Sequence, residues 1–133
     1  MIGDEPKRAL AEAEGWLVSA KHTLTEAQSE EILSNVCCAE AILGIIRAND
    51  ALTLKFFGNK ATKHDDAASL FANLVREKKI KKEDERFREL IAKAMRDKSG
   101  ATYGKGKAFT YEEAKEYVEK AEGFVAAAKE YID

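Results

Sequence analysis

The sequence contains no long hydrophobic run, and this absence argues against a membrane protein. No stretch approaches the roughly 18 consecutive apolar residues of a transmembrane helix. The first residues, MIGDEPKRAL, also lack the basic segment followed by an apolar one that marks a signal peptide. We therefore expect a soluble protein that works in the cytoplasm and does not bind membranes.

An excess of one charge and groups of metal-binding side chains are also missing. The chain has 22 Lys and Arg against 24 Asp and Glu, so its net charge of -2 gives no argument for binding nucleic acid. The only cysteines, Cys37 and Cys38, are adjacent and diverge by about 100° on a helix, so we expect reduced, buried thiols. His22 and His64 have no other ligands at metal-binding spacing, so neither a metal nor a cofactor is predicted.

Proline is nearly absent and the alternation typical of strands is missing, which predicts an all-α protein. With 133 residues, the chain is long enough for one domain, 1–133, with its own core. Apolar residues at three- and four-residue spacing predict an up-and-down bundle of about five helices with a long central second helix. The predicted helices span residues 4–27, 29–58, 65–78, 83–98 and 110–131.

The stretch 29–58 is the longest of these segments. Ser29 is predicted to cap its start, and Gly58 to end it in a left-handed conformation. Glu40, Arg47 and Lys55 form the only stripe expected to face solvent, because most of the remaining circumference is apolar. The other helices are therefore expected to surround this one.

Three residues inside this central stretch call for an explanation. Gly44 costs about 1 kcal/mol relative to alanine in a helix, which predicts close approach of another backbone, within the chain or across a dimer. Asn49 and Asp50 lie on apolar flanks, where polar groups need partners. They indicate either a structural hydrogen bond or ion pair to another helix, or a functional pocket.

Residues 95–107 combine positive charge, an aromatic residue and glycines. No phosphate-binding P-loop, nucleophile elbow or spaced carboxylate pair is present. In this segment Arg96, Lys98, Tyr103 and Lys105 offer cations to hold a phosphate backbone and a ring to stack a base. The alternative is an ordinary loop between helices, and the lysine-rich KKIKKEDE is interpreted as a solvated connector.

The sequence resembles a HEPN domain, the helical "higher eukaryotes and prokaryotes nucleotide-binding" family, in its small stand-alone form. The resemblance covers nearly the whole chain. The matching segments are AEGWLVSAKHTL, AILGIIRANDAL, KHDDAASLF, AMRDKSGATYG and TYEEAKEYVEKAEGFV. It implies a bundle that dimerises and is encoded beside a minimal nucleotidyltransferase as a toxin–antitoxin pair.

Active HEPN proteins are metal-independent RNases, in which an Arg is followed four to six residues later by a His at the end of the fourth helix. Here Lys98 and Tyr103 stand in those places. A tyrosine with a pKa of about 10 is a poor proton shuttle near neutral pH, so little or no RNase activity is expected.

The resemblance therefore predicts a non-catalytic homodimer that binds a nucleotide, RNA or a nucleotidyltransferase. Its candidate groove is formed around Lys98 and Tyr103, with Asp50 and His64 as neighbours. The alternatives are a divergent RNase that uses Lys98, Tyr103 and His64, and a purely structural dimerisation module.

Overall fold

A computed structural model describes residues 4–60, 66–103 and 108–132, and every regular element in these ranges is helical. The elements are α1 (Glu5–Ala27), α2 (Leu33–Phe57), α3 (Asp66–Arg76), the 3-10 helix η2 (Lys82–Arg86), α4 (Phe87–Tyr103) and α5 (Tyr111–Ile132). The predicted all-α bundle is confirmed. None of the described helices is long and apolar enough to span a membrane.

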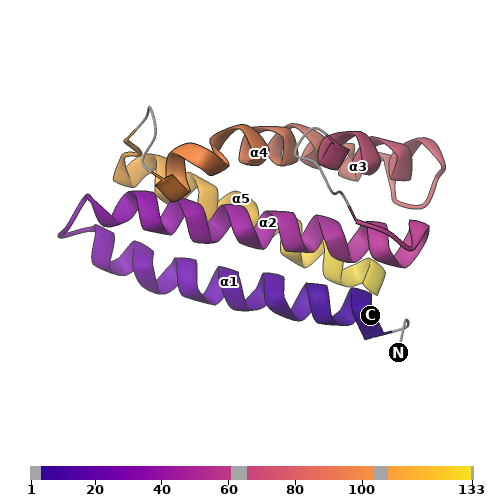
Figure 1. The fold of residues 1–133 in the computed structure, drawn as a ribbon, viewed down its shortest axis with the longest axis horizontal. Coiled ribbons are helices and arrows are strands. Elements are labelled where there is room, and N and C mark those ends of the chain that lie inside the picture. Colours follow the sequence, from indigo (N-terminus) through magenta and orange to yellow (C-terminus); the bar gives the residue numbers. More distant parts are fainter. Residues whose placement is uncertain (1–3, 61–65, 104–107, 133) are drawn as a thin grey trace.

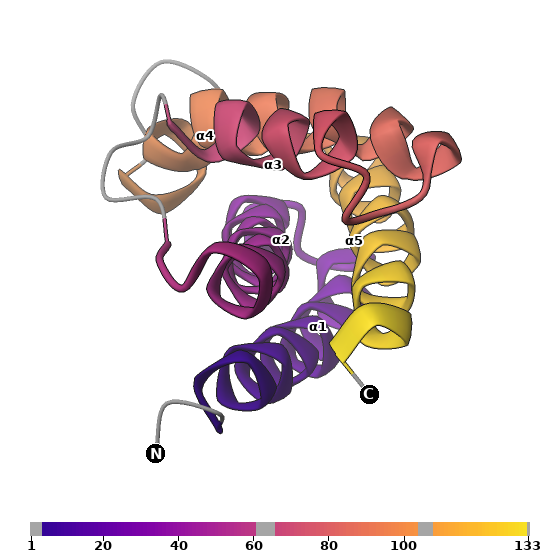
Figure 2. The same cartoon turned by 90° about the vertical axis from the view of Figure 1, so that its right-hand side faces the viewer.

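Helix α2 lies at the centre of the bundle. It runs beside α1 along the length of the molecule (Figure 1) and also packs against α3, α4 and α5. In the end-on view, α3 and α4 lie above α2, α5 lies beside it and α1 lies below it (Figure 2). The prediction that other helices surround the central one is confirmed.

The side chains of α2 that point into the bundle form the core with the apolar faces of the other helices. Phe124 of α5 contacts Phe71 of α3 and Phe87 of α4, with ring centroids 5.9 Å and 5.0 Å apart. Cys37 and Cys38 are free and fully buried, as predicted. Burial is the main cause that raises the pKa of each thiol to about 12.

The predicted start of α2 is wrong and its predicted end is confirmed. The helix begins at Leu33, and Ser29 lies in the preceding turn, where its hydroxyl donates a hydrogen bond of 3.2 Å to the carbonyl of Glu26. Ser29 therefore completes the end of α1. Gly58 adopts the predicted left-handed conformation, with φ of 77°, and its N–H bonds the carbonyl of Leu54.

The stripe of Glu40, Arg47 and Lys55 does not simply face solvent. Glu40 accepts hydrogen bonds from Ser19 and Thr23 of α1. Arg47 pairs with Glu12 of α1 at 3.0 Å, and Lys55 donates to the backbone carbonyl of Tyr131 in α5. Glu40 and Arg47 are half-buried, so their predicted exposure was wrong, because their charged groups bridge to α1. Lys55 is exposed, as predicted.

Gly44 lies where α2 packs closely against the backbone of α1, as predicted. A Cβ at this position would lie 3.4 Å from the carbonyl oxygen of Ala13 and 3.6 Å from the Cβ of Trp16. Asn49 donates a hydrogen bond of 3.2 Å to the carbonyl of Ala67 in α3, which is the predicted contact with another helix.

The boundaries of the fourth helix differ from the prediction at both ends. Residues 82–86 form a 3-10 turn before α4, and α4 continues through Ser99 and Gly100 to Tyr103. Burial of Ala101, which is 6% exposed, favours this extension over a loop. The capping box of α5 is confirmed, because Thr110 Oγ1 accepts from the N–H of Glu113 and Glu113 accepts from the N–H of Thr110.

Replacement of Gly44 tests the close approach of α1 and α2. We expect Gly44→Leu to lower the free energy of unfolding by about 1–3 kcal/mol, because the backbone of α1 must move to admit the side chain. Gly15→Leu is the matched control, since a Cβ there meets nothing within 4 Å. Urea unfolding measures both. Equal stabilities of the two variants would contradict the close packing.

The buried thiols predict a loss of stability at alkaline pH. Their pKa is raised in the folded state from the ordinary value of 9.0, so the unfolded chain loses these protons first. Their stabilising contribution is complete below pH 9 and declines as pH rises toward 12, by up to about 1.4 kcal/mol per thiol and pH unit. Urea unfolding at pH 8 and pH 10 measures this decline. A Cys37→Ala/Cys38→Ala control should decline less steeply, and an equal decline would refute the assignment.

Candidate anion-binding groove

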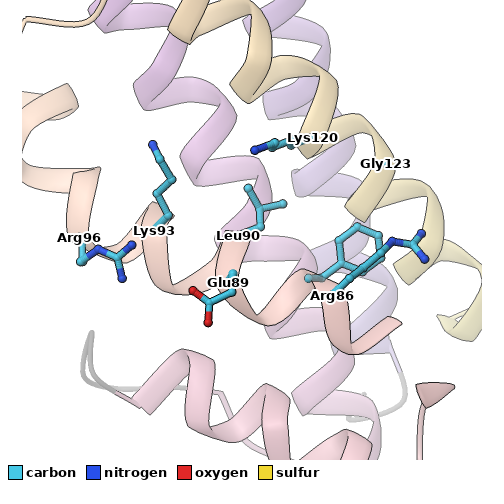
Figure 3. Close-up of a pocket in the computed structure, with 8 residues that line it drawn as sticks. Arg86, Glu89, Leu90, Lys93, Arg96, Lys120 and Gly123 are labelled. Atoms are coloured by element: carbon cyan, nitrogen blue, oxygen red, sulfur yellow. The ribbon is translucent and has the colours of Figure 1, made fainter. Parts of the chain in front are cut away.

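A groove of about 470 Å³ lies between α4 and α5, at the surface of the bundle (Figure 3). Four basic side chains and one carboxylate line it, over an apolar floor. The lining residues are Arg86, Phe87, Glu89, Leu90, Lys93, Arg96, Lys120 and Gly123. Its volume lies within the range of small-ligand sites in proteins.

Helical spacing brings these side chains together. On α4, residues three or four positions apart share a face, and the face that carries Leu90 and Lys93 is turned toward α5. Phe87 and Leu90 form the floor and are each 8% exposed. Gly123 of α5 lines the opposite wall, and a Cβ there would meet nothing within 4 Å. The absence of a side chain at this position widens the groove.

The four basic side chains of the groove differ in whether a nearby carboxylate already forms an ion pair with them. Lys93 pairs with Asp97 at 2.7 Å, and Lys120 pairs with Glu116 at the same distance. The hydrogen bond from Lys120 is the main cause that lowers the pKa of Glu116. The two lysines therefore already have carboxylate partners.

The two arginines are more available. The guanidinium of Arg86 lies 4.5 Å from the centre of the Phe87 ring and 3.9 Å from Asp84. Arg96 makes no hydrogen bond or ion pair with any other residue of the described ranges. Figure 3 shows these arginines at opposite ends of the groove. They are ten residues apart, which corresponds to about 15 Å along a helix.

A polar contact joins α4 to α5 beside the groove. Tyr117 donates a hydrogen bond to Asp97, and Lys93 lies 2.7 Å from the same carboxylate and 4.4 Å from the centre of the tyrosine ring. Burial, followed by the hydrogen bond to Asp97, raises the pKa of Tyr117 above its ordinary value. The phenol is therefore protonated at neutral pH and acts as a donor.

The structure places only part of the predicted site at this groove. Arg96 lines it, whereas Lys98 is half-buried and lies two residues further, about 200° around the helix axis. Because α4 is continuous to Tyr103, positions 98 and 103 are about 140° apart. The side chain of Tyr103, together with His64 and Lys105, lies outside the described part of the chain.

Asp50 lies away from the groove. It is buried on α2 and pairs with Arg47 at 2.8 Å. Cys38, on the same helix, is close enough to Lys93 and Asp97 for their charges to influence its pKa. Twelve residues, or about 18 Å of helix, separate Asp50 from Cys38. Asp50 therefore has a structural ion pair and does not line the groove.

Arg86, Lys93 and Lys120 are lining residues that the sequence interpretation missed. Arg86 at the end of η2 and Lys93 and Arg96 of α4 recur at spacings of seven and three, which is a recognisable pattern for one side of a helix. Nothing in the sequence indicates that Lys120 joins them, because it lies on a different helix.

Comparison of the sequence with models of known protein families and with curated proteins gives no match. Among the side chains that the structure describes, no group of three or more His, Cys, Asp or Glu could hold a metal ion.

Replacement of Tyr117 tests the contact between α4 and α5. We expect Tyr117→Phe to lower the free energy of unfolding by about 1–2 kcal/mol, because the largely buried Asp97 loses a donor. Tyr111→Phe should change it by less than about 0.5 kcal/mol, since that hydroxyl only accepts an exposed bond from Gln28. Urea unfolding distinguishes the two. Equal losses of stability in the two variants would contradict a stabilising hydrogen bond from Tyr117 to Asp97.

Proposed function

We propose that this chain is a non-catalytic HEPN-like protein of the cytoplasm that binds the phosphate groups of a nucleotide or RNA in the groove between α4 and α5. The observation that supports this most is the convergence of four basic side chains on one groove with an apolar floor. Arg86 and Arg96 contribute most, because neither is bound to a carboxylate at short range.

The chemistry of arginine suits this role. Its planar guanidinium presents several donors in a fixed geometry that matches two oxygens of a phosphate. Lys93 and Lys120 lie between the arginines and add positive charge along the groove. Leu90 and the open wall at Gly123 offer an apolar surface on which part of a nucleoside can rest.

Two observations favour binding without cleavage. The raised pKa of Tyr117 makes its phenol unsuitable as a base, and no histidine lines the groove in the part of the chain that is described. In addition, Lys98 and Tyr103 occupy positions about 140° apart on one continuous helix. This arrangement does not favour their joint action on one phosphate, which the divergent RNase alternative requires.

An exposed apolar surface supports binding of a protein partner as well. Ile32 is 81% exposed and Val36 is 47% exposed at the start of α2. Both residues line one surface hollow with Ala101 and Ala108, and contiguous exposed apolar surface is typical of contact sites. The partners we propose are a second copy of the chain and, as the resemblance suggests, a minimal nucleotidyltransferase. A structural dimerisation module would use the same surface.

Binding and cleavage can be measured together with labelled single-stranded and structured RNA, and with ATP, in the presence of a chelator. We expect intact RNA and binding that weakens as salt rises. Arg86→Glu/Arg96→Glu should weaken binding at least about tenfold, since each change replaces attraction with repulsion. The matched control is Lys7→Glu/Arg8→Glu, which reverses two exposed charges on α1.

Three outcomes would count against the proposal. Failure to bind both RNA and ATP would refute it, and equal losses in the two double variants would show that the groove has no special role. RNA cleavage that Tyr103→Phe abolishes would instead support the RNase alternative.

A further inference from the structure

The turn between α1 and α2 carries an exposed apolar side chain that directly follows two acidic ones. Ile32 is the most exposed large apolar residue that the structure describes. Glu30 and Glu31 precede it and are exposed. Backbone hydrogen bonds from Leu33 to Glu30 and from Ser34 to Glu31, of 3.0 Å and 2.8 Å, fix the turn. We call Glu30, Glu31 and Ile32 the acidic corner.

The groove between α4 and α5 has the complementary properties. Its floor is apolar at Leu90, and Arg86 and Arg96 at its ends are available to bind carboxylates. Its volume of about 470 Å³ is ample for one isoleucine side chain. An exposed apolar residue that complements a pocket elsewhere on the same protein creates a contact between copies.

A chain cannot place its acidic corner in its own groove. Gln28, in the same turn, donates a hydrogen bond of 3.1 Å to the hydroxyl of Tyr111, at the start of α5. Lys120 and Gly123, which line the groove, lie nine and twelve residues further along α5, or about 14 and 18 Å. Only the corner of another molecule can therefore enter the groove.

We propose that a second copy of this chain docks its acidic corner into the groove between α4 and α5. Ile32 of one copy covers Leu90 of the other, and Glu30 and Glu31 pair with the arginines. Each chain carries one corner and one groove, so two copies related by a twofold axis make this contact twice. The proposal goes beyond the proposed function, because it makes the second copy and a phosphate ligand competitors for the same cations.

Charge reversal with rescue tests this contact, with the dissociation constant of self-association measured by analytical ultracentrifugation. Glu30→Lys/Glu31→Lys and Arg86→Glu/Arg96→Glu should each weaken self-association at least about tenfold. All four changes in one chain should restore it to within about threefold of the wild type. An equimolar mixture of the two double variants should also associate, because each corner then meets a groove of opposite charge.

Two further variants separate the proposed contact from general effects of charge and folding. Ile32→Ser should weaken association at least about tenfold, while the thermal unfolding midpoint stays near that of the wild type, since this side chain is exposed. Glu5→Lys/Glu77→Lys reverses two exposed charges outside both surfaces and should leave association unchanged.

A wild-type chain that stays monomeric at all concentrations would overturn the proposal. Association that the reversals leave intact, or that the fourfold variant and the mixture fail to restore, would assign the contact to another surface and also overturn it. RNA and ATP binding is measured separately. Loss of that function would therefore leave the result on self-association standing.

Discussion

The structure depends on the burial of α2 by the helices around it. This helix has apolar residues over most of its circumference, and it cannot be stable in water without cover on several sides. It packs closely against α1 at Gly44, where an added Cβ would already touch the carbonyl oxygen of Ala13. Elsewhere around α2, α4 and α5 come together where Phe87 and Phe124 are in contact. The groove is the surface seam between these two covering helices.

Features with a local or periodic signal could be predicted from the sequence. The number of helices, the capping box at Thr110 and the left-handed Gly58 each depend on residues within a few positions of one another. The glycine inside α2 was also informative, because a residue that weakens a helix has to be explained by packing. These predictions succeeded because no contact between distant segments opposes the local preference.

The helix boundaries that failed are those where tertiary contacts override local preference. Ser29 is a good capping residue, but it completes the end of α1 and leaves Ile32 at the start of α2. Gly100 suggests a loop, yet burial of Ala101 favours continuation of α4. Glu40 and Arg47 look like solvent-facing charges until α1 supplies their partners. Sequence spacing alone cannot show which helix lies opposite a charged side chain.

The candidate site was predictable only in part, for the same reason. Arg96 could be chosen from its local charge, but Lys120 lies 24 residues later and joins it only through the packing of α4 against α5. Lys98 and Tyr103 were assigned from the spacing of the HEPN motif, with the fourth helix expected to end at Lys98, whereas α4 continues to Tyr103. On a continuous helix they lie on different sides. The HEPN resemblance itself stays a prediction, because the comparisons with known families and curated proteins give no match.

The charge balance of the groove determines how an anion can bind. Lys93 and Lys120 already have carboxylate partners, so an incoming phosphate or carboxylate meets Arg96 and Arg86 first. To recruit Lys93 as well, the anion must compete with Asp97, which also holds the hydroxyl of Tyr117. Binding of an anion at the centre of the groove therefore competes with the interactions among Lys93, Asp97 and Tyr117 that join α4 to α5. An anion held only at the two ends leaves that contact intact.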